Sequence, residues 1–146
     1  MVLKVVESEK SEHEKRQKLG RRSKTKGNNY ERDTAKRFKE AYGEELVRTP
    51  QSGGFAKKSA KANDFRGDIV PADEDIDLSL HVECKCAKTW SLPAWFKQAK
   101  EDCPEGKIPV VVFHQHQTSN DYIALGLQDF FNLVPKDKII LRKRSE

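Results

Sequence analysis

Residues Phe65 to Lys88 read FRGDIVPADEDIDLSLHVECKCAK, and this stretch decides the fold. Two runs with alternating apolar residues flank the Pro- and Asp-rich segment Pro71 to Asp77, which is typical of a turn. The pattern therefore predicts two strands joined as a hairpin. Successive side chains of a strand point to opposite faces, so the second strand should carry a charged face and an apolar face. These faces are His81, Glu83 and Lys85 on one side and Val82, Cys84 and Cys86 on the other. We expect the apolar set to enter the core and the charged set to face water, a metal or a substrate.

The hairpin brings an acid–acid–base combination together, with Asp68 on its first strand and Glu83 and Lys85 on its second. Two carboxylates can hold a hard cation such as Mg²⁺, which keeps several waters. Such an ion lowers the pKa of a bound water and stabilises charge on a phosphorus centre. A nearby Lys can orient that water or neutralise the phosphate. The combination predicts metal-dependent phosphodiester cleavage. The alternative is a surface strand with an ordinary Glu–Lys pairing.

Four ordered motifs carry a resemblance to a known superfamily. Arg66 to Val70 followed by Val82 to Lys85 resembles the PD-(D/E)xK nuclease signature, with Gly67 where a Pro often precedes the Asp. Within that superfamily the chain is most similar to the archaeal Holliday junction-cleaving enzymes and their phage relatives. They open with a helix similar to Lys26–Asp33 and carry a Ser/Gly-rich loop similar to Gln51–Gly54. The likeness spans roughly Lys26 to Val134.

The resemblance implies a restriction-endonuclease-like core and an Mg²⁺ cofactor, for which Mn²⁺ would substitute. It implies that Asp68 and Glu83 ligate the metal, helped by the Cys84 backbone carbonyl and, through water, by Glu31. It also implies that Ser52 matters for cleavage. Enzymes that cut both strands of a four-way junction need two active sites, so the resemblance further implies a homodimer with two-fold symmetry.

The remaining pattern completes the order of elements. It predicts helices at 29–42, 94–102 and 127–134, and strands at 45–49, 108–114 and 121–125. With the hairpin, this order suits an α/β fold in which a mixed central β-sheet is flanked by helices. Residues 139–141 are predicted to add an edge strand or an oligomer contact.

Spacing also predicts which side chains enter the core. The first helix should begin at Gly27-Asn28, and its apolar stripe is Tyr30, Thr34, Phe38, Ala41 and Tyr42. The inward residues expected in the later helices are Trp95, Phe96, Phe130, Phe131 and Val134. Gln98 follows the Glu-x-Lys strand on a helix and could reach the site.

Positive charge is concentrated at the N-terminus. Residues 1–26 carry nine Lys or Arg and four Glu, whereas the remainder carries 28 − 9 = 19 basic and 23 − 4 = 19 acidic residues. From Lys15 to Lys26 there are seven basic residues and no acidic one. We interpret 1–26 as a flexible, DNA-binding arm, which includes Lys24 and Lys26, and 27–146 as the nuclease domain with a basic tail. The alternative is a solubilising disordered tail.

A long loop at 50–63 is predicted to grip the substrate. It offers Ser52 and three lysines, Lys57, Lys58 and Lys61, for phosphate contacts, and Lys88 offers another just beyond the hairpin. Trp90 could touch a sugar or phosphate. The alternative is a flexible solvated loop.

Size and composition limit the class of protein. At 146 residues the chain suits one domain. It has no membrane-length apolar run and no signal-peptide core, so we expect it in the cytoplasm of a phage-infected host or in a prokaryotic nucleoid. An odd count of three Cys argues against a disulfide framework. Zinc bound by Cys84, Cys86, His114 and His116 is disfavoured, because structural zinc sites usually use wider Cys spacing on turns.

Three functions remain open. The first is a structure-selective DNA endonuclease resembling a Holliday junction resolvase, with branched or four-way DNA as substrate. The second is a restriction- or repair-type nuclease acting on duplex DNA. The third is a non-catalytic nucleic-acid-binding module whose Glu83 and Lys85 merely pair.

Overall fold

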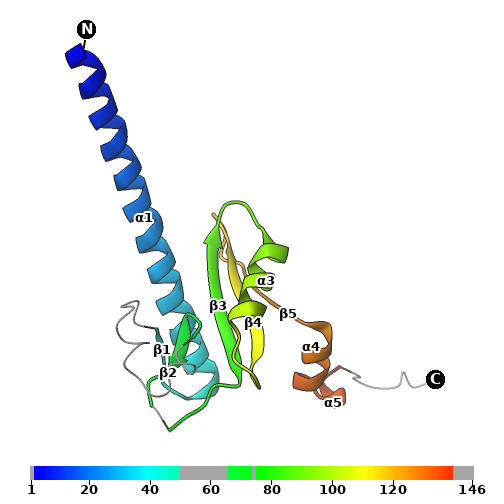
Figure 1. Ribbon diagram of the computed structural model, residues 1–146. Helices are drawn as coiled ribbons and strands as arrows, with labels where there is room; N and C mark the ends of the chain where they lie inside the picture. The colour runs from blue at the N-terminus through cyan, green and yellow to red at the C-terminus, as the bar shows by residue number, and fades with distance from the viewer. Residues whose placement is uncertain (1, 50–65, 74, 140–146) are drawn as a thin grey trace.

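A computed structural model describes residues 2–49, 66–73 and 75–139 (Figure 1). The elements are α1 (Val2–Tyr42), β1 (Leu46–Arg48), β2 (Ile69–Pro71), β3 (Leu80–Ala87), α3 (Leu92–Asp102), β4 (Ile108–Gln115), β5 (Asp121–Leu125), α4 (Leu127–Leu133) and α5 (Lys136–Ile139). Ser52, Lys57, Lys58 and Lys61 lie outside the described residues, as does the predicted loop that contains them.

The five strands form one mixed sheet in the order β1-β2-β3-β4-β5. β3 and β4 are parallel and pair from Leu80↔Ile108 to Ala87↔Gln115, while the other neighbours are antiparallel. A parallel pair needs a crossover connection, and α3 provides it. The predicted α/β fold with a mixed sheet flanked by helices is confirmed.

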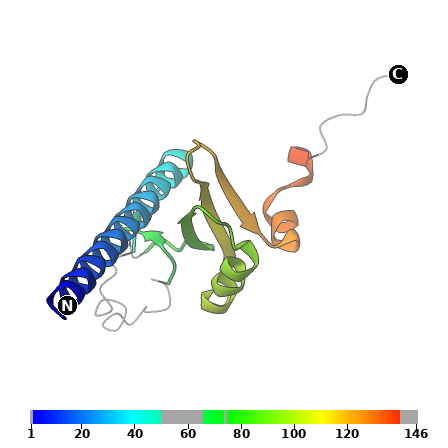
Figure 2. The same cartoon turned by 90° about the horizontal axis from the view of Figure 1, so that it is seen from above.

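The sheet has a helix on each face. The C-terminal half of α1 covers one face and α3 the other (Figures 1 and 2). The core against α1 contains Ala35, Leu46, Ile69, Val82, Cys84, Val110 and Val112, and the core against α3 contains Ala99, Val111 and Phe113. Both faces of β4 are covered, which explains why its sequence is a near-continuous apolar run.

Helix α1 is longer than predicted. It does not begin at Gly27-Asn28 but runs without interruption from Val2. Lys, Arg, Glu and Gln are good helix formers, and without a Pro the two glycines are tolerated within the helix. Residues 11–26 are exposed throughout, and burial begins at Gly27. The flexibility expected of residues 1–26 stays a prediction.

The predicted stripe on α1 is only partly correct. Thr34 is 3% exposed, and Tyr30 and Phe38 pack against the core. Ala41 is exposed and Tyr42 is 73% exposed, because the helix has passed the sheet by its last turn. The stripe therefore ends at Phe38.

The C-terminal helices do not fold back onto the sheet. Phe130 and Phe131 were expected inward, but they are 37% and 54% exposed, and only Val134 is half-buried. Because α4 has seven residues and follows β5 after Gly126 alone, it continues past the sheet edge (Figure 1). The predicted edge strand at 139–141 is wrong at Ile139, which lies in α5, and residues 140 and 141 lie outside the described ranges.

Within the described part of the chain, none of the helices has the length and apolar character needed to cross a membrane.

Candidate active site

The β2–β3 hairpin places the two signature acids side by side. Ile69 pairs with Val82 in antiparallel register, so Asp68 stands opposite Glu83. The Cys84 backbone N–H donates a 2.7 Å hydrogen bond to Oδ2 of Asp68. The side chain of Asp68 is thereby directed onto the strand that carries Glu83 and Lys85.

The backbone of Asp68 is held from both neighbouring strands. Its N–H donates to the Val82 carbonyl at 2.7 Å, and its carbonyl accepts from the Thr49 N–H at 2.9 Å. The Thr49 hydroxyl also donates to the Gly67 carbonyl at 2.7 Å. Asp68 therefore sits at a fixed position although it precedes the first residue of β2.

The surroundings of Asp68 favour its neutral form. Burial raises the pKa of Asp68 to about 6, and the negative charges of Glu83 and Glu31 add to the effect, while the Cys84 N–H and Lys85 oppose it. The negative charges of Glu83 and Glu31 beside Asp68 give this site excess negative charge, which a divalent cation would relieve.

Glu83 has the opposite environment. Burial alone would raise the pKa of Glu83, but His81 and Lys85 outweigh it and hold that pKa below its usual range. Glu83 is therefore ionised where Asp68 is still partly protonated. Two carboxyl groups whose pKa values are pushed apart are typical of catalytic sites.

Lys85 is positioned by two partners. Its Nζ lies 3.3 Å from Oε2 of Glu83 and donates to Oε1 of Gln98, on α3, at 3.2 Å. Gln98 thus reaches Lys85 from the helix that follows the strand. The Lys85 side chain is 22% exposed, so its ammonium group remains open to a substrate or a water.

Helix α1 adds a third carboxylate to this region. Glu31 is 8% exposed and ion-pairs with Arg48 of β1, whose Nη2 also donates to Oδ1 of Asn28 at 2.8 Å. Glu31 contributes to the raised pKa of Asp68, so its charge acts on the same site. Arg48 was not predicted, because the last residue of β1 belongs to none of the motifs.

His81 was expected on the charged face, toward water, metal or substrate, and that expectation is wrong. Its side chain is fully buried, with Nε2 3.5 Å from Oε1 of Glu83. Neither ring nitrogen has a hydrogen-bond partner among the described residues. Its position two residues before Glu83, on the same face, is the signal that could have identified it as a neighbour of that acid.

Gly67 makes room for that histidine. Its φ is +94°, and a Cβ there would lie 3.0 Å from the Val82 carbonyl oxygen and 3.2 Å from Nδ1 of His81. A Pro cannot adopt this φ, because its ring fixes φ near −65°. The departure from the usual Pro-Asp signature thus has a physical reason in this chain.

The remaining predicted residues lie apart from this centre. Lys24 and Lys26 are exposed on the part of α1 that precedes the buried turns, and Lys88 is exposed just after β3. Trp90 contacts two aromatic rings, with centroids 5.0 Å from Phe113 and 5.6 Å from Tyr122. That edge-to-face packing gives Trp90 a structural role.

The zinc alternative finds no support. Burial raises the pKa of the Cys84 thiol, which disfavours the thiolate that zinc requires. His114 is engaged by Asp121, with Nδ1 and Oδ1 2.9 Å apart. Within the described ranges, no group of three or more His, Cys, Asp or Glu side chains could enclose a metal. An open Mg²⁺ site with two carboxylates and several waters does not require such an enclosure, and it fits Asp68 and Glu83.

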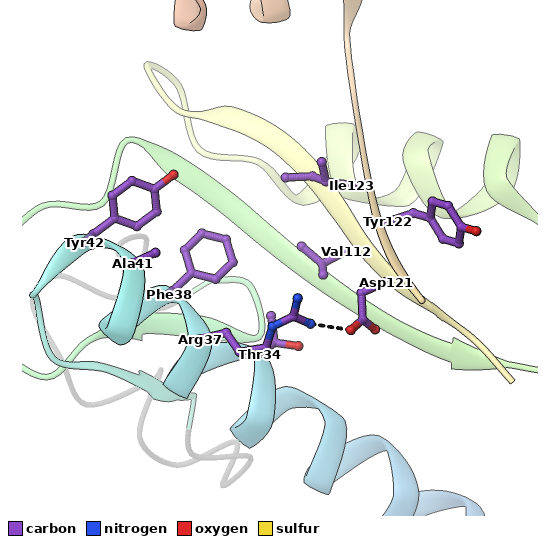
Figure 3. A pocket seen from close by; sticks show the side chains of 9 residues that line it. All are labelled: Thr34, Arg37, Phe38, Ala41, Tyr42, Val112, Asp121, Tyr122 and Ile123. Atoms are coloured by element: carbon purple, nitrogen blue, oxygen red, sulfur yellow. Dashed lines mark hydrogen bonds and ion pairs between the residues drawn. The ribbon is translucent and has the colours of Figure 1, made fainter. Parts of the chain in front are cut away.

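A separate pocket of about 390 Å³ lies between α1 and β5 (Figure 3). Arg37 and Asp121 form an ion pair across it, and the same Asp121 holds His114. Burial would raise the pKa of Asp121, but its contacts with His114, Tyr30 and Arg37 outweigh this and lower it. None of the predicted catalytic residues lines this pocket. The ion pair between Arg37 of α1 and Asp121 of β5 holds the helix against the sheet.

Comparison with known families agrees with this geometry. A family model described as "Phage putative PDDEXK endonuclease" matches residues 22–145. The chain belongs to this family. The match includes Glu31, the β2–β3 hairpin and α3, and so confirms the predicted PD-(D/E)xK superfamily. Searches of the curated proteins and of the solved structures each found no match.

Gly67→Ala tests the contact with His81. The substitution should lower the free energy of unfolding, because it combines a strained positive φ with a collision at the Val82 carbonyl. Gly43→Ala is the matched control, since Gly43 also has a positive φ of +78° but no atom within 4 Å of the added Cβ. Strain from the positive φ should lower the free energy of unfolding of each variant by about 1 kcal/mol. The close contact should lower that of Gly67→Ala further, as measured by urea unfolding. Equal losses would show that the close approach is unimportant.

Asp68→Asn tests the raised pKa. The folded-state pKa of about 6 lies above the ordinary 3.8, so the folded protein binds more protons between these values. The contribution of Asp68 to stability therefore falls as pH rises from about 4 to about 6. Without metal, Asp68→Asn should have a higher Tm than wild type at pH 7 and a smaller advantage at pH 4. Adding Mg²⁺ at pH 7 should raise the wild-type Tm only, and a variant less stable than wild type at pH 7 would contradict the assignment.

Proposed function

We propose that this member of the PD-(D/E)xK family is a metal-dependent DNA endonuclease that hydrolyses phosphodiester bonds. The observation that carries the proposal is the convergence of Asp68 and Glu83 on one hairpin, with the Lys85 ammonium 3.3 Å from Glu83. These two carboxyl groups and the ammonium group would act together on a scissile phosphate.

The Asp68 and Glu83 carboxylates would hold Mg²⁺, with the Cys84 carbonyl as a third oxygen ligand and Glu31 acting through water. Mn²⁺ would substitute, because both are hard cations that accept oxygen ligands. The bound ion would stabilise the charge that develops on the phosphate. The raised pKa of Asp68 is consistent with this proposal, because burial and then the nearby charges of Glu83 and Glu31 disfavour its ionised form without a cation.

Lys85 would orient the attacking water or neutralise the phosphate. Gln98 acts as its positioning residue, because the amide oxygen and the Glu83 carboxylate hold the ammonium from two sides. Ser52, in the Ser/Gly-rich loop, would assist cleavage, and Lys57, Lys58, Lys61 and Lys88 would contact phosphates. The proposed role of Ser52 rests on the sequence motif alone, and that of the three loop lysines rests on their charge alone.

We propose branched DNA, with a four-way junction as the defining case, as the preferred substrate. The similarity of Lys26–Asp33 and Gln51–Gly54 to junction-cleaving enzymes supports this choice. A restriction- or repair-type nuclease acting on linear duplex is the second candidate. The word "phage" in the family description supports the DNA of a phage-infected cell as the setting of this activity.

A homodimer would supply the two active sites that symmetric cutting requires. A second copy fits the apolar surface around α4 and β5, because large exposed apolar patches mark interaction sites. The exposed side chains are Tyr122, Ile123, Leu127, Phe130, Phe131, Leu133 and Ile139. Three of them, Ile123, Phe130 and Leu133, line a groove of about 600 Å³ between α4, the sheet and the end of α1.

Glu83→Gln is the decisive test of function. Wild type with Mg²⁺ should cut a four-way junction faster than linear duplex or single strands, and EDTA should end cutting. Glu83→Gln should lose at least 100-fold in rate, an amount typical of a missing electrostatic interaction in a catalytic site, yet still bind DNA in an anisotropy assay. Glu101→Gln, an exposed change of the same kind on α3, is the control and should leave the rate unchanged. Equal rates on junction and duplex would favour the second candidate, and unchanged cutting by Glu83→Gln would refute this active site.

Phe131→Glu tests the homodimer. Phe131 is 54% exposed on α4, and a charge there should convert a dimer into a monomer in light scattering coupled to size-exclusion chromatography. Leu19→Glu, at a 66% exposed position on α1, is the matched control and should remain dimeric. A wild-type monomer at concentrations that support cleavage would refute the dimer.

A further inference from the structure

The N-terminal half of α1 is a helix without a protein partner in the described structure. Residues 11–26 are all exposed, and the helix extends past the end of β3, away from the sheet (Figure 1). From Glu7 to Lys26 the only large apolar residue is Leu19, so no heptad or amphipathic stripe exists there. Residues 7–26 of this helix therefore have no apolar face with which to form a coiled coil or enter a membrane.

Charge divides this half of the helix into two blocks. Residues 7–14, the acidic block, contain four Glu and one Lys, whereas residues 15–26, the basic block, contain seven Lys or Arg and no acid. The basic block alone carries +7, more than the whole-chain charge of +5, while residues 27–146 are balanced. Among the described residues, Arg16 of the basic block pairs with Glu12 of the acidic block at 3.8 Å, and no ion pair joins the basic block to residues 27–139.

The basic block has a fixed relation to the active site, because Glu31 lies on the same uninterrupted helix. At about 1.5 Å of rise per residue, the block begins about 8 Å from Glu31 and ends about 24 Å away. One face carries Lys15, Lys18, Arg22 and Lys26 at intervals of three and four residues. Five consecutive phosphates of one DNA strand cover about the same length as the block.

We propose that the basic block of α1 binds the duplex that flanks the cut, and that the acidic block ends this contact. The inference rests on the proposed nuclease function and adds to it a second contact, remote from the metal site. Residues 15–21 lie before the segment that the family model matches. The Glu residues of the acidic block repel phosphates, and the DNA contact should therefore reach about seven base pairs from the cut and no farther.

The experiment measures DNA binding without cleavage, in an Asp68→Asn background, by fluorescence anisotropy over a range of salt concentrations. The arm variant replaces Lys15, Lys18, Arg22 and Lys26 with Gln, which keeps helix propensity and removes four charges. The slope of log K against log salt should fall by about 0.9 for each phosphate that the arm no longer neutralises, and binding at 100 mM salt should weaken at least tenfold. Circular dichroism should show unchanged helix content.

The matched control removes the same number of charges from the body. It replaces Lys36, Lys39, Lys97 and Lys100, all exposed, with Gln. This variant should keep nearly the wild-type slope, because three of the four already pair with Glu40, Glu45 and Glu101. An equal decrease of the slope in both variants would assign the effect to net charge and would refute DNA binding by the basic block.

Two further outcomes test the boundary between the blocks. Glu12→Gln with Glu14→Gln should bind duplexes longer than about seven base pairs more tightly than the unchanged acidic block does. An affinity that is insensitive to these changes would refute the acidic limit. Binding of phosphatidylserine vesicles by the basic block, with no effect of the arm variant on DNA, would assign the block to membranes instead.

The inference and the proposed function fail separately. If the arm variant binds DNA more weakly but wild type never cuts DNA with any divalent metal, DNA binding by the basic block is supported and the nuclease proposal fails. If wild type cuts DNA and the arm variant binds and cuts as wild type does, the nuclease proposal is supported and DNA binding by the basic block is refuted.

Discussion

One short contact between two strands organises the site. β2 and β3 pair only at Ile69 and Val82, yet Asp68 is fixed there by the Val82 carbonyl, the Thr49 N–H and the Cys84 N–H. A slip of one residue would turn Glu83 to the other face, away from Lys85 and Gln98. Buried Ile69 and Val82, at 1% and 0% exposed, oppose such a slip because it would bring charge into the core.

The same hairpin sets the electrical character of the centre. Three carboxylates, Asp68, Glu83 and Glu31, face two cations, Arg48 and Lys85. Arg48 pairs with Glu31 and Lys85 with Glu83, so Asp68 has no ion-pair partner of its own among the described residues. Burial, and then the charge of Glu83, raise the pKa of Asp68. The excess is held in a half-buried position, where charge interactions are weakly screened.

Local patterns predicted most of the fold, and long-range packing accounts for what they missed. Alternation in 65–88 and the apolar run at 108–114 identified the hairpin and the central strand, and the signature spacing predicted that Asp68, Glu83 and Lys85 come together. His81 looked solvent-facing because burial depends on what covers a strand, here the backbone of Gly67. Phe130 and Phe131 looked internal because periodicity shows an apolar face but not the direction in which a short helix leaves the sheet.

The three carboxylates at the site bear on where the chain carries its positive charge. A centre with three carboxylates repels DNA, and the balanced body, 19 basic against 19 acidic residues, adds little attraction at distances beyond the Debye length. In the proposed nuclease, attraction to DNA would therefore come from a bound cation and from basic residues set apart from the acids. Lysines placed beside Asp68 would pair with it, lower its pKa and compete with the metal. On the exposed part of α1 the lysines and arginines would be available to the proposed polyanion, while the carboxylates of the hairpin would remain available to the proposed ion.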